Sequence, residues 1–205
     1  SAHFDVNYFY YYDKSKQREP SPELFVLEPV VRAYWTDGRV ANGRNSQNYI
    51  AHMEQGGDIK TYEHRIGGKF GLDFEPLSGL KIQGVFAPKF QFYQNKNFKL
   101  AIPMYNLDDK DNVATYVNGL NETSLYESRN QNKEYTTQFL VNYMKDLGKH
   151  NLNFLAGYEH YYYFRETLGA SRRYFTLKNY PYLDLGPLDF RDNSGNAEEY
   201  ASRSY

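Results

Sequence analysis

The chain contains five histidines, a residue type that commonly binds metal ions. None of them stands at His-x-x-x-His spacing beside a carboxylate, which is the arrangement of a helical zinc site. The chain has no cysteine, so thiolate ligands, disulfides and a cysteine nucleophile are excluded. The spacing favours structural roles for the histidines, and we predict no metal site and no cofactor. The histidines are His3, His52, His64, His150 and His160.

Carboxylates occur close together at two places. Asp108, Asp109 and Asp111 lie in a polar stretch and could offer oxygen ligands to Ca²⁺, but the stretch lacks the glycine and the final glutamate of an EF-hand loop. Glu198 and Glu199 could supply the acid and base of glycoside hydrolysis, but they fall where a strand is expected to begin. We interpret both groups as solvated and predict that the chain is not an enzyme.

Aromatic residues in polar stretches are the candidates for binding a ligand. A ring beside polar groups can stack on the apolar face of a sugar while its polar end stays in water. The alternative is that these rings pack within the loops or against a partner protein. A basic group, Arg172, Arg173 and Lys178, is either solvated or in contact with lipopolysaccharide phosphates. The candidate ligand-binding rings are Tyr34, Trp35, Tyr49, Tyr105, Tyr174, Tyr180 and Tyr182.

The composition indicates what kind of scaffold holds these residues. Aromatics make up 18% of the chain, with 22 Tyr and 14 Phe, yet the mean hydropathy is −0.80. Strands with one face toward lipid and the other toward water combine many rings with a low average hydropathy. The net charge of −1 disfavours a nucleic-acid partner. No run of about 18 apolar residues occurs, so we expect no transmembrane helix.

Alternation of apolar and polar residues predicts the strands. From Tyr62 to Phe74 and from Leu80 to Phe92, the even positions are mostly apolar and the odd ones mostly polar, small or charged. We expect the even positions to face lipid. Pro88 cannot donate a hydrogen bond, so we expect a bulge or a locally unpaired position there. Further strands are expected at 2–13, 125–145 and 152–164, with a sixth opening at 199–205. The residues predicted to face a barrel lumen are Glu63, Arg65, Lys69, Lys81 and Glu159.

The connections predict the architecture. Two short turns, 75–79 and 146–150, alternate with long loops at 14–60, 96–122 and 166–198. Short turns at one end and long loops at the other are typical of outer-membrane barrels. The fold class is therefore all-β, and residues 1–205 are expected to form part of a single antiparallel transmembrane β-barrel domain. Known barrels have eight or more strands, and Ser1 opens directly onto strand-like sequence without a signal peptide. We therefore expect a processed or partial chain that does not fold alone in buffer.

Four segments resemble, in order, segments of the SusC/RagA-type TonB-linked outer-membrane proteins. They are 29–38 (PVVRAYWTDG), 50–57 (IAHMEQGG), 70–81 (FGLDFEPLSGLK) and 150–159 (HNLNFLAGYE). The resemblance extends over residues 25–205, and each motif alone is short.

The resemblance implies a 22-stranded barrel in the outer membrane of a Gram-negative cell, with a plug domain in its lumen and long extracellular loops. It further implies import of an oligosaccharide or peptide, driven by TonB through the plug, with a SusD-like lipoprotein over the mouth. The plug, the TonB box, the signal sequence and the C-terminal strand have no counterpart in these 205 residues. The alternatives are a non-catalytic soluble or surface carbohydrate-binding β-domain, and an adhesin-like surface protein.

Overall fold

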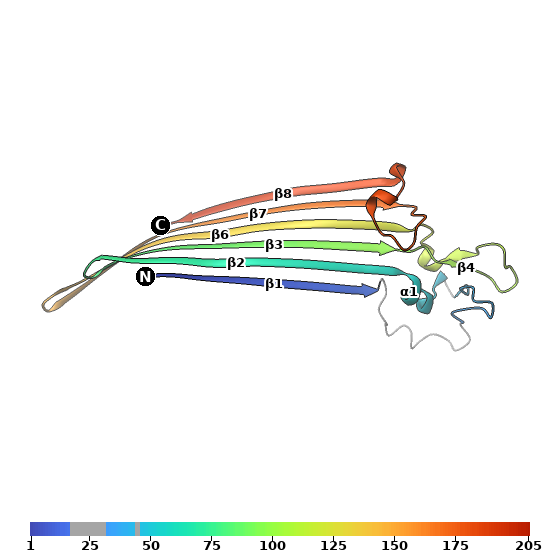
Figure 1. Ribbon diagram of the computed structural model, residues 1–205, viewed down its shortest axis with the longest axis horizontal. Coiled ribbons are helices and arrows are strands. Elements are labelled where there is room, and N and C mark those ends of the chain that lie inside the picture. Colours follow the sequence, from blue (N-terminus) through green and yellow to red (C-terminus); the bar gives the residue numbers. More distant parts are fainter. Residues whose placement is uncertain (17–31, 44–45) are drawn as a thin grey trace.

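The computed structural model describes residues 1–16, 32–43 and 46–205. Six long strands form one antiparallel sheet in the order β1-β2-β3-β6-β7-β8, with β1 and β8 at its two edges (Figure 1). The fold class is therefore all-β with an antiparallel sheet, as predicted. The sheet is open and does not close into a barrel. The long strands are β1 (Ala2–Lys16), β2 (Gly57–Leu77), β3 (Leu80–Lys99), β6 (Ser124–Leu147), β7 (His150–Arg173) and β8 (Arg191–Ser204).

Two tight hairpins lie at one end of the sheet, and the long connections lie at the other (Figure 1). The hairpin from β2 to β3 turns at Gly79, where φ is +85°, and the hairpin from β6 to β7 turns at Gly148, where φ is +66°. Glycine adopts these left-handed conformations without the steric cost of a Cβ. Both predicted short turns are confirmed, but they are tighter than the predicted 75–79 and 146–150, at 78–79 and 148–149. Both chain ends lie toward the hairpin side of the sheet.

The strand register confirms the alternation. Phe70 stands opposite Phe4 on β1 and Phe86 on β3, and Phe86 stands opposite Thr137 on β6. Because side chains opposite each other in a ladder share a face, the even positions of β1, β2, β3 and β7 lie together with the odd positions of β6 and β8. We call this the apolar face and the opposite one the polar face.

Pro88 has no partner on β2, although the pairing on either side of it keeps one register. Gly67 pairs with Lys89 and Phe70 with Phe86, so no residue has been inserted between these pairs. The position is therefore locally unpaired rather than a bulge, as expected for a residue without an N–H group.

The strands are longer than predicted, and the predicted loop boundaries at 60, 96, 166 and 198 are wrong. β2 begins at Gly57, β3 runs to Lys99, β7 runs to Arg173, and β8 begins at Arg191 rather than at 199. Toward the loop end the side chains become polar on both faces, so alternation no longer marks the strand. Hydrogen bonding in the ladder continues there regardless of side-chain polarity.

The connections at the loop end are partly folded, and the long loop predicted at 96–122 contains short elements of its own. Residues 100–123 contain β4 (Pro103–Met104), β5 (Thr115–Tyr116) and the 3₁₀ turn η3 (Val117–Gly119), while residues 32–56 contain helix α1 (Tyr49–Gln55). The third connection, 174–190, contains the 3₁₀ turns η4 (Leu183–Leu185) and η5 (Leu188–Phe190). Residues 17–31 and 44–45, including the first part of the 29–38 segment, lie outside the described residues.

The hydrophobic residues that this chain buries lie mainly at the loop end. One cluster joins Val40, Ala51, Ile102, Met104 and Val117, and another joins Phe98, Leu125 and Phe175. The large residues of the apolar face stay uncovered, and their exposure reaches 76% for Phe4 and 63% for Phe74. Among the described residues, no helix has the length and apolar character needed to cross a membrane.

Candidate functional site

The best-defined site is a folded cap at the loop end, formed by residues 32–43, 46–56 and 100–119. Asn48 holds it together from one buried position: its side-chain amide donates to the carbonyls of Ala33 (2.8 Å) and Ala41 (3.0 Å). Its Oδ1 accepts from the backbone N–H of Ala51 at 3.0 Å, which makes it the N-cap of α1. One side chain therefore starts the helix and fixes the segment that precedes it.

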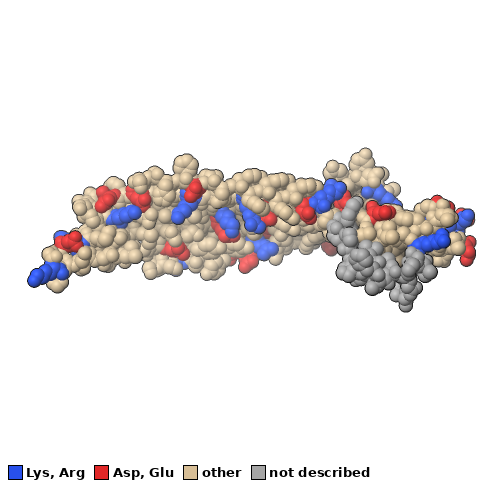
Figure 2. Space-filling model, turned by 90° about the horizontal axis from the view of Figure 1, so that it is seen from below, with Lys and Arg blue, Asp and Glu red and all other residues tan. Residues whose placement is uncertain are grey.

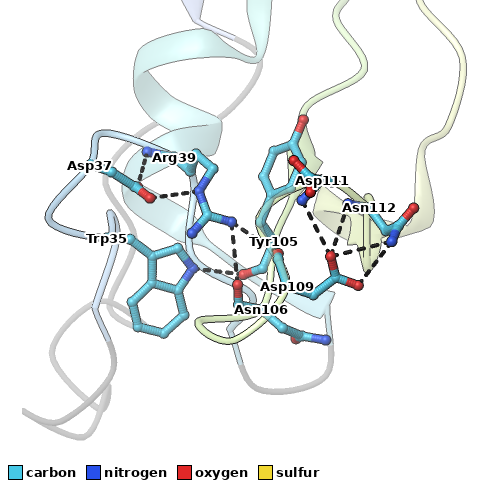
Figure 3. Close-up of polar contacts among 8 residues, drawn as sticks. All are labelled: Trp35, Asp37, Arg39, Tyr105, Asn106, Asp109, Asp111 and Asn112. Carbon is cyan, nitrogen blue, oxygen red and sulfur yellow. Dashed lines mark hydrogen bonds and ion pairs between the residues drawn. The ribbon is translucent and has the colours of Figure 1, made fainter.

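Arg39 joins the first segment of the cap to the segment that contains Asn106 and Asp109 (Figure 3). Its Nη1 donates to the backbone carbonyls of Asn106 (3.3 Å) and Asp109 (3.0 Å), and its Nε donates to Asp37 at 2.8 Å. The guanidinium also lies 5.5 Å from the centre of the Tyr105 ring. Hydrogen bonds from Arg39 hold the pKa of Asp37 below its usual value.

Asp109 shapes the turn that Arg39 contacts. Its carboxylate accepts from the backbone N–H groups of Asp111 (3.2 Å) and Asn112 (3.1 Å) and from the Asn112 side chain. The bond from the Asn112 side chain is the largest cause of the lowered pKa of Asp109. Asp109 thus has a local structural use, and the part of the chain that the structure describes contains no group of three or more His, Cys, Asp or Glu side chains able to hold a metal ion.

Several candidate rings pack within this cap. The indole N–H of Trp35 donates to the carbonyl of Tyr105 at 2.7 Å. The hydroxyl of Tyr34 donates to Glu54, and burial, followed by this bond, raises the pKa of Tyr34. Tyr49 donates to Gln47 at 2.6 Å. Trp35 and Tyr105 therefore join the two connections, and Tyr34 packs against the hydrophobic cluster that both connections share. This is the packing role weighed against ligand binding.

The other three rings lie on the 174–190 connection and are exposed. Tyr174 packs on Phe190, with ring centres 4.4 Å apart. Tyr182 lies over the ammonium group of Lys96 on β3, at 4.7 Å. Tyr180 is 58% exposed. The seven candidate rings are thus divided between two regions, and Tyr174, Tyr180 and Tyr182 are the ones presented to solvent.

The residues predicted to face a lumen share the polar face. Glu63 accepts from Gln91 and Arg65, and Glu159 accepts from Gln138. Lys81 lies 3.8 Å from Asp73, and Lys69 stands opposite Asp5 in the register. Figure 2, seen from the side of β1, shows acidic and basic side chains next to each other along the sheet, without a large area of one sign. The hydrogen bonds and ion pairs of the polar face make it a connected surface suited to water.

The paired carboxylates of β8 do not form an acid–base pair. Glu198 stands opposite Arg165 and Glu199 opposite Phe164, so the two side chains point to opposite faces of the sheet. Two carboxylates that flank one glycosidic bond must face the same space.

Two residues that organise the cap, Arg39 and Asn48, are not among the candidates from sequence. An asparagine immediately before a short apolar helix is a recognisable N-cap signal. Nothing near Arg39 in the sequence indicates that its partners lie about 70 residues away, at Asn106 and Asp109.

We expect Arg39→Lys to loosen the cap without unfolding the sheet. A lysine keeps the charge but cannot reach two carbonyls and a carboxylate with one planar group. Loss of these bonds is expected to cost about 1–2 kcal/mol, and limited proteolysis should then cut residues 105–112 about tenfold faster. Lys110→Arg, in the same exposed turn, is the matched control. Equal cleavage of both variants and the original protein would show that Arg39 does not hold the turn.

No protein-family model matches the sequence, and comparison with curated proteins finds no match either.

Proposed function

We propose that this chain is a segment of a transmembrane β-barrel that imports solutes across the outer membrane of a Gram-negative cell. The observation that carries the proposal is an uncovered apolar band on one face of a sheet whose other face is polar. Monomeric soluble proteins rarely expose a contiguous apolar area larger than a few hundred Å². Alternating apolar-out and polar-in strands are the pattern of outer-membrane barrels.

The band has the dimensions of a bilayer core. On β3 it runs from Leu80 to Phe90, which at about 3.4 Å per residue is about 34 Å of strand. Tilted by about 40–45°, this length spans about 25 Å, which is the height of the apolar belt of such barrels. Across the sheet, the band includes Phe4 on β1, in the row of Phe70 and Phe86, and Phe154 on β7, in the row of Leu80 and Tyr143. β8 is polar on both faces and carries Glu199 and Arg203 on this one.

The open edges of the sheet support the same proposal. Lipid cannot satisfy unpaired backbone groups, so a membrane-spanning sheet must close with further strands. In the proposed 22-stranded barrel, β1 and β8 pair with strands outside this segment. The polar face then lines a lumen occupied by a plug domain.

The class of importer follows from the resemblance to SusC/RagA-type proteins. On that basis we propose TonB-dependent uptake of an oligosaccharide or peptide, with a SusD-like lipoprotein over the extracellular mouth and no catalytic role for this chain. The alternative, a soluble or surface carbohydrate-binding β-domain, requires another protein surface to cover the apolar band. Purification distinguishes the two, because a barrel needs detergent and a soluble domain elutes without it.

Protease added to intact cells should cut the long connections and spare the tight turns. The proposal places 100–123 and 174–190 outside the cell and the turns at Gly79 and Gly148 in the periplasm. Cleavage within 174–190 is expected first, because that connection carries exposed side chains over most of its length. Cutting at Gly79 or Gly148 in intact cells would invert the proposed orientation.

The exposed rings provide the test of ligand binding. We expect Tyr180→Ala to weaken binding of the transported ligand by about 1 kcal/mol, the order of one aromatic contact, while the lipoprotein stays bound. Trp35→Ala should also weaken ligand binding or uptake, but it breaks the 2.7 Å bond to Tyr105 and so loosens the cap as well. Loss of the lipoprotein with unchanged ligand affinity would assign these rings to packing instead.

A further inference from the structure

A row of three lysines crosses the apolar face on the loop side of the band. Lys14 on β1 stands opposite Lys60 on β2, and Lys60 stands opposite Lys96 on β3. Like charges directly opposite each other in a sheet are destabilising unless opposite charges compensate them. The row therefore marks a place where the sheet holds positive charge at a cost.

Among the residues that the structure describes, opposite charges compensate this row only in part. Lys14 pairs with Asp58 at 3.0 Å, and Lys96 pairs with Glu127 at 2.9 Å. Lys60, between them, forms no ion pair among the described residues, and neither does Arg129 one row closer to the band. Glu166 is the nearby carboxylate that is likewise without an ion pair in the described chain.

These groups line a half-open hollow on the apolar face. A cavity of about 700 Å³ is lined by Lys60, Lys96, Arg129 and Glu166, with rings of Tyr62 and Phe92 on the side of the band. Tyr182, from the 174–190 connection, lies over Lys96 and overhangs the cavity. Lys178 of the same connection joins Lys60 and Lys96 around a neighbouring cavity of about 280 Å³.

The order of side chains along β3 matches the cross-section of a lipid monolayer. Phe86 and Phe90 belong to the apolar band, Phe92 follows, and then come Gln94 and Lys96 on the same face. Acyl chains would contact the band, and a headgroup would reach the level of Gln94 and Lys96. A negatively charged group at that level meets Lys60 and Arg129, which form no ion pair among the described residues, with the carboxylate of Glu166 beside them and the ring of Tyr182 above.

We propose that this hollow binds the phosphate group of a lipid in the adjoining leaflet. The inference rests on the proposed membrane placement, which puts the band in the hydrocarbon and the lysine row at headgroup level. Lys60 and Arg129 contact the phosphate oxygens, and Tyr182 covers the headgroup. Phosphate accepts several charge-assisted hydrogen bonds at once, which suits converging ammonium and guanidinium groups.

The test uses the complete protein in micelles of a maltoside detergent, which carries no phosphate, and two fluorescent probes with identical acyl chains. One is phosphatidic acid and the other is diacylglycerol, which lacks the phosphate. We expect phosphatidic acid to bind preferentially, and Lys60→Gln with Arg129→Gln to weaken its binding about thirtyfold, from about 1 kcal/mol for each of the two cations near a membrane surface. Lys89→Gln with Lys81→Gln, which removes two cations from the polar face, should leave binding unchanged.

Three results would overturn the inference. Equal binding of both probes would remove the role of phosphate, and an equal loss in the control variant would remove the role of this hollow. Displacement of phosphatidic acid by millimolar inorganic phosphate would identify a site for the free ion rather than a lipid. Unchanged flotation of each variant with lipid vesicles shows that the membrane placement holds, so failure of the lipid site is distinguishable from failure of the proposed function.

Discussion

Replacing Phe86 by arginine should destabilise the membrane-embedded protein by about 2–4 kcal/mol, the cost of a cation at mid-depth on the lipid face of a barrel. Phe86 lies near the middle of the apolar band. Its ring centre is 6.5 Å from that of Phe70 and 6.1 Å from that of Tyr135. The substitution loses these contacts and places a charge in hydrocarbon. Urea titration of the protein folded into lipid vesicles measures the difference in the free energy of unfolding.

Gln83→Arg is the matched control on the same strand. Gln83 stands opposite Asp73 on the polar face, so a new guanidinium there meets water and a carboxylate. We expect a change of less than about 1 kcal/mol, as for an exposed ion pair. If both variants lose the same stability, the two faces do not differ in environment and the membrane placement is wrong.

Truncating Met104 should release the cap from the end of the sheet. Met104 is fully buried and packs in the cluster that joins the 32–56 and 100–123 connections. Met104→Ala leaves a cavity between them, and such truncations cost about 2–5 kcal/mol. Because the cap has a hydrophobic core of its own, we expect local opening rather than global unfolding. The rate of hydrogen exchange in residues 32–43 and 100–119 should rise at least thirtyfold. This factor corresponds to about 2 kcal/mol, the lower limit of the expected loss in the free energy of cap opening.

Leu107→Ala provides the comparison for Met104. Leu107 belongs to the same connection but is 58% exposed, so its truncation should leave exchange unchanged. If Met104→Ala instead accelerated exchange uniformly along β2, β3 and β6, cap and sheet would be one cooperative unit. That result would contradict a separately stabilised cap.

The sequence predicted the sheet where its two faces differ. Between Tyr62 and Phe92 the alternation gave the strands, the hairpin at Gly79 and the shared face of Phe70 and Phe86. The same signal disappears above the band. Lys96 and Glu127 form an ion pair on the apolar face, so polarity there no longer distinguishes the two faces. Strand ends at that level depend on backbone pairing, which leaves no periodic signal.

The candidate site was predicted less completely than the sheet. The aromatic residues near the mouth could be listed, but their division into packed and exposed rings depends on contacts between distant segments. Trp35 is held by a carbonyl 70 residues away, and Tyr34 is held by Glu54 on α1. The two side chains that fix the cap, Arg39 and Asn48, act mainly through backbone carbonyls. A contact to a backbone carbonyl does not depend on the identity of the partner residue. No pair of residue types in the sequence therefore predicts it.

Collision accessibility of spin labels along β3 tests the central claim most directly. The chain has no cysteine, so single cysteines from position 80 to position 96 can each be labelled within this segment. In lipid vesicles, oxygen should reach labels at even positions from 82 to 90 and a water-soluble nickel complex should reach the odd ones. At 94 and 96 the even positions should become accessible to nickel as well. Equal accessibility at even and odd positions between 82 and 90 would contradict a membrane-spanning strand and with it the proposed function.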